Sequence, residues 1–250
     1  MNNLDVVYWL LALMNLTVMT FNVGNGLADP DVLVDVLRRA DADIVGLQEL
    51  ALAQAHAIGT ELRELYPHQV LVPQGFSGKG LLSRLPLRQH QPLLLYPGRP
   101  DLGASIDVHG TTLGVFIAHP PPPRVRRGRI RFDLEALAQL DRLLEHALER
   151  PPSILLGDFN MTGRNPVYAK FAAAGLQDAF AVAGVGRGWT LPLRVGHARV
   201  KHGLHGLPLV PVARVDYIWY TTGLRAEAAW IGGDAGSDHL PVLARFALSS

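Results

Sequence analysis

The sequence predicts an α/β fold in one compact domain, and two observations carry this prediction. Short apolar, β-branched runs alternate along the chain with segments whose apolar residues recur at helical spacing. Of the 250 residues, 48% are hydrophobic and 18% are charged, which excludes an intrinsically disordered chain. No linker-like tract divides the chain, and a domain of this length buries enough apolar surface to need no disulfide or structural metal.

Strands are expected wherever a short apolar, β-branched run is bounded by turn residues. The runs that fit are 16–23, 43–48, 69–72, 80–83, 104–108, 111–119, 153–157, 215–220 and 242–248. His109-Gly110 separates two of these runs by a turn sequence, which predicts a hairpin. Other runs are separated by helical segments and need crossovers, so the sheet or sheets are expected to be mixed.

Helix starts are marked by Asp29-Pro30 and Asn165-Pro166, where a capping side chain precedes a proline at the first helical position. Gly175 is expected to end the second of these helices. Between residues 132 and 150, apolar side chains recur at helical spacing. This predicts an amphipathic helix whose apolar face carries Leu134, Leu137, Leu140, Leu144 and Leu148.

The N-terminal run from Val6 to Met14 is strongly apolar, but nine residues are too few to span a bilayer. Asp5 is the only charge before it, so a signal peptide with a basic start is also a poor fit. We interpret residues 1–14 as an apolar extension that packs on the body or precedes the true start, with an interfacial anchor as the alternative. The domain itself is expected over residues 15–250, in a cytoplasmic protein for which a monomer is the default.

The chain contains no cysteine, which excludes disulfides, thiolate nucleophiles, iron–sulfur clusters and Cys-ligated zinc. The formal net charge of +1 argues against a protein that binds nucleic acid over its whole surface. The charge is unevenly distributed, however, since residues 1–118 sum to −4 and residues 119–250 to +5. Any polyanion must therefore be bound by a local patch.

Polar, acid-containing residues follow several expected strands directly, at Asn22, Glu49, Asp158 and Asp238. Each alone has an ordinary explanation as a turn or capping residue. Together they are more informative, because strand ends in an α/β sheet converge on one edge, where ligands bind. Asp216 lies inside an otherwise apolar strand, and a buried carboxylate there requires a buried partner.

Six motifs follow one another along the chain: FNVGNG with Asn22, LQEL with Glu49, His119 after an apolar strand, GDFN at 157–160, RVDYIWY at 214–220 and SDHLPV at 237–242. In this order the chain resembles the endonuclease/exonuclease/phosphatase superfamily with the deoxyribonuclease-I-like fold, from Leu16 to about Leu248. The resemblance implies a four-layer α/β/β/α sandwich with two packed mixed β-sheets. It also implies hydrolysis of phosphate esters with Mg²⁺ or Mn²⁺.

The resemblance assigns roles to these residues, and their chemistry agrees with it. Glu49, Asn22 and Asp238 offer the oxygen ligands that Mg²⁺ requires. Asp158 would activate the attacking water, and Asn160 would hold water or phosphate. His239 and His119 would donate to the non-bridging oxygens, with Asp216 as the buried partner that orients His239.

Three stretches contain no Asp or Glu, between Glu64 and Asp101, between Asp107 and Asp133, and between Asp178 and Asp216. We expect their basic residues to face an anionic substrate around the site, including Lys79, Arg84 and Arg88 of the first stretch. The candidate substrate-binding residues are Arg124, Arg126, Arg127, Arg131 and Trp189, with a plain solvated loop as the alternative.

The favoured function is a divalent-metal-dependent phosphodiesterase or nuclease, with nucleic acid as the first substrate class. The alternative enzymes are a phosphomonoesterase and a phospholipid, sphingomyelinase-like hydrolase. A non-catalytic binding member is the least favoured, because every residue of the expected site is present. Abasic-site specificity is not indicated, since the surroundings of Tyr96 do not match the required motif.

Overall fold

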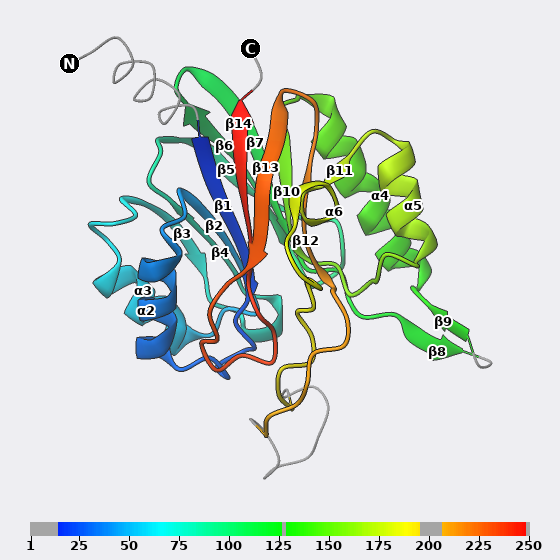
Figure 1. Cartoon of the computed structure of the whole chain (residues 1–250), viewed down its shortest axis with the longest axis horizontal. Coiled ribbons are helices and arrows are strands. Elements are labelled where there is room, and N and C mark those ends of the chain that lie inside the picture. Colours follow the sequence, from blue (N-terminus) through cyan, green and yellow to red (C-terminus); the bar gives the residue numbers. More distant parts are fainter. Residues whose placement is uncertain (1–14, 127–128, 196–206, 249–250) are drawn as a thin grey trace.

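Two six-stranded mixed sheets pack face to face, with helices on their outer faces, in a computed structural model that describes residues 15–126, 129–195 and 207–248 (Figure 1). The side chains of residues 125–130 and the whole of residues 1–14 lie outside the described part. The predicted four-layer α/β sandwich is therefore confirmed, whereas the N-terminal extension stays a prediction.

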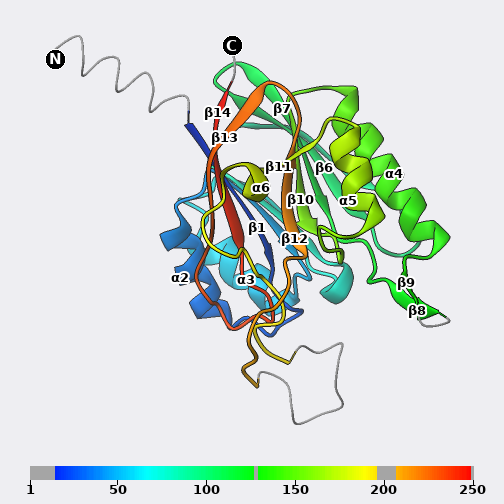
Figure 2. The same cartoon turned by 45° about the vertical axis from the view of Figure 1, so that its right-hand side comes forward.

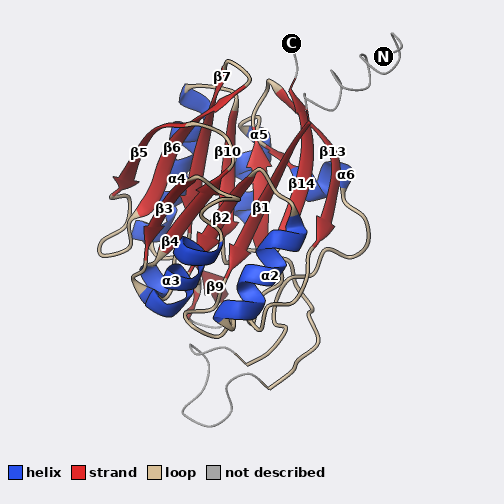
Figure 3. Cartoon of the chain, turned by 90° about the vertical axis from the view of Figure 1, so that its left-hand side faces the viewer, coloured by secondary structure: helices blue, strands red, loops and turns tan. Residues whose placement is uncertain are grey.

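The first sheet has the order β13-β14-β1-β2-β4-β3. Only β1 and β2 are parallel, because α2 crosses between them, and the other neighbours are antiparallel. Helices α2 (Pro30–Ala40) and α3 (Leu52–Glu61) lie across the outer face (Figure 3). The strands are β1 (Asn15–Asn22), β2 (Ile44–Gln48), β3 (His68–Val72), β4 (Lys79–Ser83), β13 (Leu224–Ile231) and β14 (Val242–Leu248).

The second sheet has the order β11-β12-β10-β7-β6-β5, and its parallel pair is β7 with β10. Helices α4 (Leu134–Glu149) and α5 (Pro166–Ala173) lie outside it (Figure 2). The short α6 (Ala179–Ala183) contacts β12 and β13. The strands are β5 (Leu87–Leu93), β6 (Asp101–Val108), β7 (Thr111–Ala118), β10 (Ser153–Asp158), β11 (Gln177–Asp178) and β12 (Asp216–Tyr220).

The inner faces of the sheets meet in an apolar core that includes Ile117 and Leu156. Gly46 in β2 allows the two sheets to approach closely, since a Cβ there would lie 2.9 Å from Leu156 Cδ1. Two further clusters lie under α2 and α3 and under α4 and α5. This packing fixes the strand ends of the two sheets against each other.

The expected helix starts occur as predicted. Asp29 accepts hydrogen bonds from the N–H groups of Asp31 and Val32, and Asn165 accepts one from Val167. The β6–β7 hairpin turns at His109 and Gly110, both with positive φ. The two helix starts and the hairpin turn could be predicted because one or two local residues specify each of them.

The predicted apolar face of α4 was wrong in part. Leu134 is 82% exposed and Leu148 is 39% exposed, because the helix packs through Ala136, Leu143 and Ala147 as well as Leu140 and Leu144. Among the elements that had no sequence prediction are α3, α6, β5, β11 and β13. β5 is an edge strand with mostly exposed residues, so it carries no apolar alternation.

A buried ion pair anchors β12, the strand that carries Asp216. The Arg214 guanidinium donates to both carboxylate oxygens of Asp178 at 2.8 and 2.7 Å and lies 4.5 Å from the Tyr217 ring centroid. Tyr168 donates to the same carboxylate at 3.0 Å.

In the described part of the chain, no helix has the length and apolar character needed to cross a membrane.

Replacing Asp178 should destabilise the fold strongly. Its side chain is 1% exposed, so Asp178→Ala leaves the Arg214 charge without its partner and should lower the unfolding free energy by about 3 to 5 kcal/mol. Urea denaturation measures this. Asp141→Ala, which removes an exposed pair with Lys170, is the matched control and should change stability by less than about 1 kcal/mol. Equal midpoints for the two variants would contradict this account.

Candidate active site

Strand ends from both sheets meet at one edge and bring the predicted polar residues together. Asn22 ends β1, Glu49 follows β2, and Asp158 ends β10. Asp216 begins β12 and is paired directly with Asp158, because β12 runs antiparallel to β10. His119 follows β7, and the segment 237–239 precedes β14.

Asp158 lies at the centre of this group and is only 1% exposed. Its Oδ2 accepts a hydrogen bond from Asn22 Nδ2 at 3.0 Å, and its Oδ1 accepts one from the Asn160 backbone N–H at 2.9 Å. Asn160 Nδ2 in turn donates to the Pro120 carbonyl at 3.0 Å. Burial would raise the pKa of Asp158, but His239 and His119 lower it to about 2. Asp158 is therefore ionised at neutral pH.

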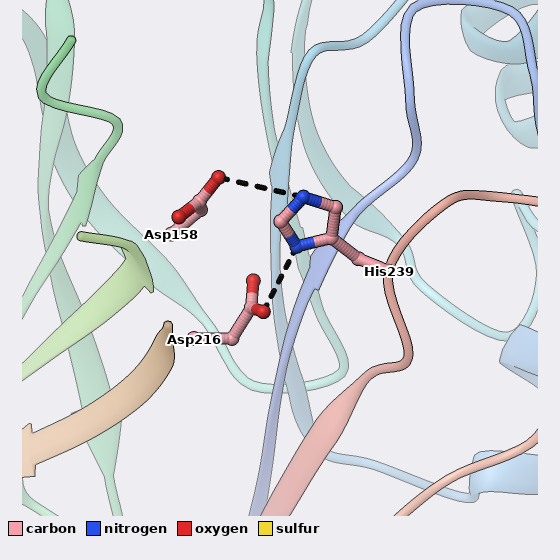
Figure 4. A group of neighbouring side chains, drawn as sticks. All are labelled: Asp158, Asp216 and His239. Atoms are coloured by element: carbon pink, nitrogen blue, oxygen red, sulfur yellow. Dashed lines mark hydrogen bonds and ion pairs between the residues drawn. The ribbon is translucent and has the colours of Figure 1, made fainter. Parts of the chain in front are cut away.

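His239 lies between two carboxylates, as Figure 4 shows. Its Nδ1 is 2.9 Å from Asp216 Oδ2, and its Nε2 is 3.7 Å from Asp158 Oδ2. Burial would lower the pKa of His239, but Asp216 and Asp158 raise it to about 10. His239 is thus an imidazolium at neutral pH, and Asp216 is the residue that fixes its ring.

The Ser237 hydroxyl positions His239, and His239 in turn pairs with Asp216. The Ser237 hydroxyl donates to the Asn22 carbonyl at 2.7 Å and accepts the His239 N–H at 3.2 Å. Burial raises the pKa of Asp216, and the neighbouring His239 opposes that effect. Asp216 Oδ1 has no hydrogen-bond partner among the described residues, so His239 is the group that compensates this carboxylate.

His119 is oriented from two sides. Its Nδ1 is 3.2 Å from the Phe76 carbonyl, which can only accept, so Nδ1 carries the hydrogen. Its Nε2 faces Asp158 at 3.4 Å and Glu49 at 3.6 Å. Its backbone N–H donates to Asp101 Oδ1 at 3.1 Å. The ring nitrogen that is not held by the backbone therefore points into the site.

The three predicted metal ligands lie around one turn. Asn22 Nδ2 donates to Glu49 Oε1 at 3.2 Å, and Asn22 Oδ1 accepts the Gly24 N–H at 3.0 Å. A Cβ on Gly24 would lie 3.2 Å from Asp238 Oδ1, which places that carboxylate beside the same turn. Glu49 has a left-handed backbone with φ 55, a strained conformation typical of functional sites.

The carboxylates of Glu49 and Asp238 fit a hard divalent cation, whereas Asn22 faces Glu49 with Nδ2 and its Oδ1 would have to turn towards a bound ion. Burial raises the pKa of Glu49, while His119 and the Asn22 amide partly offset that effect, so the carboxylate lies in a place that a cation would stabilise. A second group, Asp158, Asp216 and His239, has donor atoms within 4.8 Å of one another. There, however, the imidazolium already occupies the space between the carboxylates, and a metal needs the neutral ring. A divalent cation therefore fits better beside Glu49 than among Asp158, Asp216 and His239.

Several residues that support the site were missed from the sequence. Asp101 is buried and also accepts from Gln139 Nε2 at 2.6 Å. Lys79, which the sequence predicted to face the substrate, is instead buried and donates to the Ser77 carbonyl at 3.1 Å, and its charge opposes the rise in the pKa of Asp101 that burial causes. Thr190, fully buried, accepts the Val215 N–H at 3.3 Å. No local motif marks any of these residues.

The basic residues of the first carboxylate-free stretch do not surround the site as expected. Arg84 pairs with Asp41 at 2.7 Å, and Arg88 pairs with Asp107, both at the opposite end of the sheets. The expectation failed because acidic partners come from other parts of the chain. Lys79 does lie near the site, but it is buried.

The candidate substrate-binding residues are described only in part. Arg124 and Arg131 are exposed and lie on β8 (Arg124–Arg126) and β9 (Arg129–Arg131). The Arg126 side chain and the whole of Arg127 lie outside the described residues. Trp189 is half-buried, with the Arg187 guanidinium 4.7 Å from the centroid of its indole ring.

Comparison with known proteins gives a consistent result. The family model described as Endonuclease/Exonuclease/phosphatase family matches residues 19–239. No curated protein sequence matches the chain.

Solved structures of this kind share the fold. An endonuclease/exonuclease/phosphatase from Beutenbergia cavernae superposes with TM-score 0.73 at 22% identity, covering 95% of this chain and 72% of that one. A Bacteroides vulgatus protein of the same description gives TM-score 0.71 at 18% identity, with 94% and 99% covered. D. rerio TDP2 complexed with single-strand DNA product gives TM-score 0.70 at 19% identity, with 93% and 98% covered.

The raised pKa of His239 predicts a specific pH dependence of stability. The folded state holds this proton up to about pH 10, whereas the unfolded state loses it near pH 6.5. The stabilisation is therefore complete below pH 6.5 and lost as the pH rises towards 10. In urea denaturation with EDTA, wild-type stability should fall more steeply over this range than that of His239→Gln. Parallel curves would show that His239 is not held as an imidazolium.

Proposed function

Because the chain belongs to the Endonuclease/Exonuclease/phosphatase family, we propose that it is a divalent-metal-dependent phosphoesterase that cleaves phosphodiesters. The observation that carries this proposal is the placement of one ionised carboxylate, Asp158, within reach of two histidine Nε2 atoms at 3.4 and 3.7 Å. A base and two hydrogen-bond donors then face the same small space, as hydrolysis of a phosphate ester requires.

Asp158 orients the attacking water and accepts its proton. With a pKa of about 2 the free carboxylate is a weak base, and this low value comes from His239 and His119. An anionic phosphate that takes over the hydrogen bonds of these two rings removes that stabilisation. Substrate binding then makes Asp158 more basic when the proton must be transferred. Asn160 holds the loop after β10 and places its amide beside the water or phosphate.

His239 donates from Nε2 to the non-bridging phosphate oxygens as negative charge develops, and His119 does so when its ring carries a hydrogen on Nε2 as well as on Nδ1. Asp216 keeps the His239 ring oriented through Nδ1, and the Phe76 carbonyl does the same for His119. Both donors are fixed before substrate arrives, so little reorganisation is needed in the transition state.

Glu49, Asn22 and Asp238 would hold the metal, Mg²⁺ or Mn²⁺. When bound, the cation would polarise a phosphoryl oxygen and stabilise charge on the leaving group. The absence of cysteine from the sequence and the oxygen-rich donor set both favour a hard cation over zinc.

Nucleic acid is the favoured substrate class, as for the structurally similar D. rerio TDP2, which was solved with a single-strand DNA product. Trp189, which is half-buried with the Arg187 guanidinium over its ring, is proposed to contact the substrate. A phosphomonoesterase and a phospholipid hydrolase are the competing assignments. An activity panel separates the three: bis-(p-nitrophenyl) phosphate, p-nitrophenyl phosphate, single-stranded and plasmid DNA, and sphingomyelin, each with Mg²⁺ or Mn²⁺.

Asp158→Asn should lower kcat on the best substrate of this panel by about 10²- to 10⁴-fold, because the amide cannot accept the proton from water. EDTA should abolish the wild-type activity, and Mg²⁺ or Mn²⁺ should restore it. Asp141→Asn, an exposed carboxylate on α4, is the control and should keep wild-type rates. Hydrolysis that survives either Asp158→Asn or EDTA would overturn the mechanism.

A further inference from the structure

The segment that leads from β7 into α4 contains a two-stranded antiparallel ribbon. β8 and β9 form a sheet of their own, separate from the two large sheets. Figures 1 and 2 both show the ribbon projecting from the body. Its register forms three cross-strand pairs: Arg124 with Arg131, Val125 with Ile130, and Arg126 with Arg129.

This register places two exposed arginines opposite each other. Directly paired residues on neighbouring antiparallel strands share a face. Arg124 and Arg131 are such a pair, and both side chains are exposed. Like charges directly opposite each other destabilise a strand pair, and an isolated two-stranded ribbon is marginal in water. An anion bound to this face would relieve the repulsion.

The nearby sequence supplies no such anion. There is no Asp or Glu between Asp107 and Asp133, and the side chains of Arg124 and Arg131 are exposed. Arginines 84, 88, 194 and 214, by contrast, all have carboxylate partners within the chain. The ribbon thus differs from the other arginine-bearing segments in presenting its described charges to solvent.

The paired charges fit a sugar-phosphate backbone. Arg124 and Arg131 lie directly opposite each other. The Cβ atoms of such a pair are about 4.5 to 5.5 Å apart, so the two long side chains can contact separate phosphates of one strand. A lipid surface would instead favour aliphatic side chains beside the basic ones, whereas the residue paired with Arg124 is another arginine.

We propose that the β8–β9 ribbon is a nucleic-acid-binding surface whose arginines contact the backbone of the strand that enters the site. Arg124 follows His119 by five residues, a chain length that spans at most about 18 Å, so one strand can contact both. The inference rests on the proposed phosphodiesterase function and adds to it a binding surface outside the catalytic group.

The test measures DNA affinity against salt concentration by fluorescence anisotropy, with EDTA present so that no hydrolysis occurs. Labelled single-stranded and duplex oligonucleotides are compared. Arg124→Gln/Arg131→Gln removes two phosphate contacts and should reduce the slope of log K against log salt by about 1.4 for the single strand and about 1.8 for the duplex. At about 0.1 M salt this corresponds to losses of about 25-fold and 60-fold.

Two further variants separate charge from fold. Arg124→Lys/Arg131→Lys keeps both charges and should keep the wild-type slope. Arg150→Gln/Arg225→Gln removes two exposed arginines at the opposite end of the sheets and should keep the wild-type affinity. A wild-type slope in Arg124→Gln/Arg131→Gln would overturn the proposal. Ribbon-dependent binding of phosphatidylserine vesicles, without binding of DNA, would also overturn it.

Hydrolysis of bis-(p-nitrophenyl) phosphate by the wild-type protein tests the proposed function separately, because this small diester has no nucleic-acid backbone for the ribbon to bind. If the wild-type protein shows no diesterase activity but DNA affinity depends on Arg124 and Arg131 as stated, the ribbon assignment stands and the enzyme assignment fails. If diesterase activity is present and the salt dependence of DNA binding is the same in the wild-type protein and Arg124→Gln/Arg131→Gln, the enzyme assignment stands and the ribbon assignment fails.

Discussion

The side-chain amide of Asn22 is the contact on which the site depends, because it donates to carboxylates from both sheets. Glu49 follows a strand of the first sheet and Asp158 ends a strand of the second, and both accept from the same Nδ2 atom. Two carboxylates this close together in a largely buried place are costly unless donors compensate them. The packing of the two sheets across Gly46 brings the carboxylates together, and the amide allows them to remain there.

The compensation extends outwards from this contact in two directions. On one side, His239 and Asp216 place an imidazolium against Asp158, and β12 is held in turn by the buried pair of Arg214 and Asp178. On the other side, His119 is fixed by Phe76 and Asp101. A phosphate that enters this group competes with Asp158 for the same donors. In the proposed mechanism, the electrostatic balance of the free protein therefore also couples substrate binding to the basicity of Asp158.

Much of the fold and the outline of the site were predictable, because strand ends and helix caps are specified locally. The need for a buried partner of Asp216 followed from the cost of a carboxylate in an apolar strand. The interactions that depend on distant chain segments were not predictable. The stretch without Asp or Glu that contains Arg84 and Arg88 suggested that these arginines lack carboxylate partners. Folding, however, brings Asp41 into an ion pair with Arg84 and Asp107 into one with Arg88. Asp101 and Gln139 meet only because α4 packs on the second sheet.

The geometry of the site favours a cation on the Glu49 side of Asp158, with His239 protonated. An anomalous difference map from crystals soaked with Mn²⁺ near neutral pH tests this placement. We expect a peak bound by Glu49 oxygen, with Asn22 and Asp238 around it, and an intact contact between His239 and Asp216. A peak among Asp158, Asp216 and His239, with the His239 ring as a ligand, would contradict it.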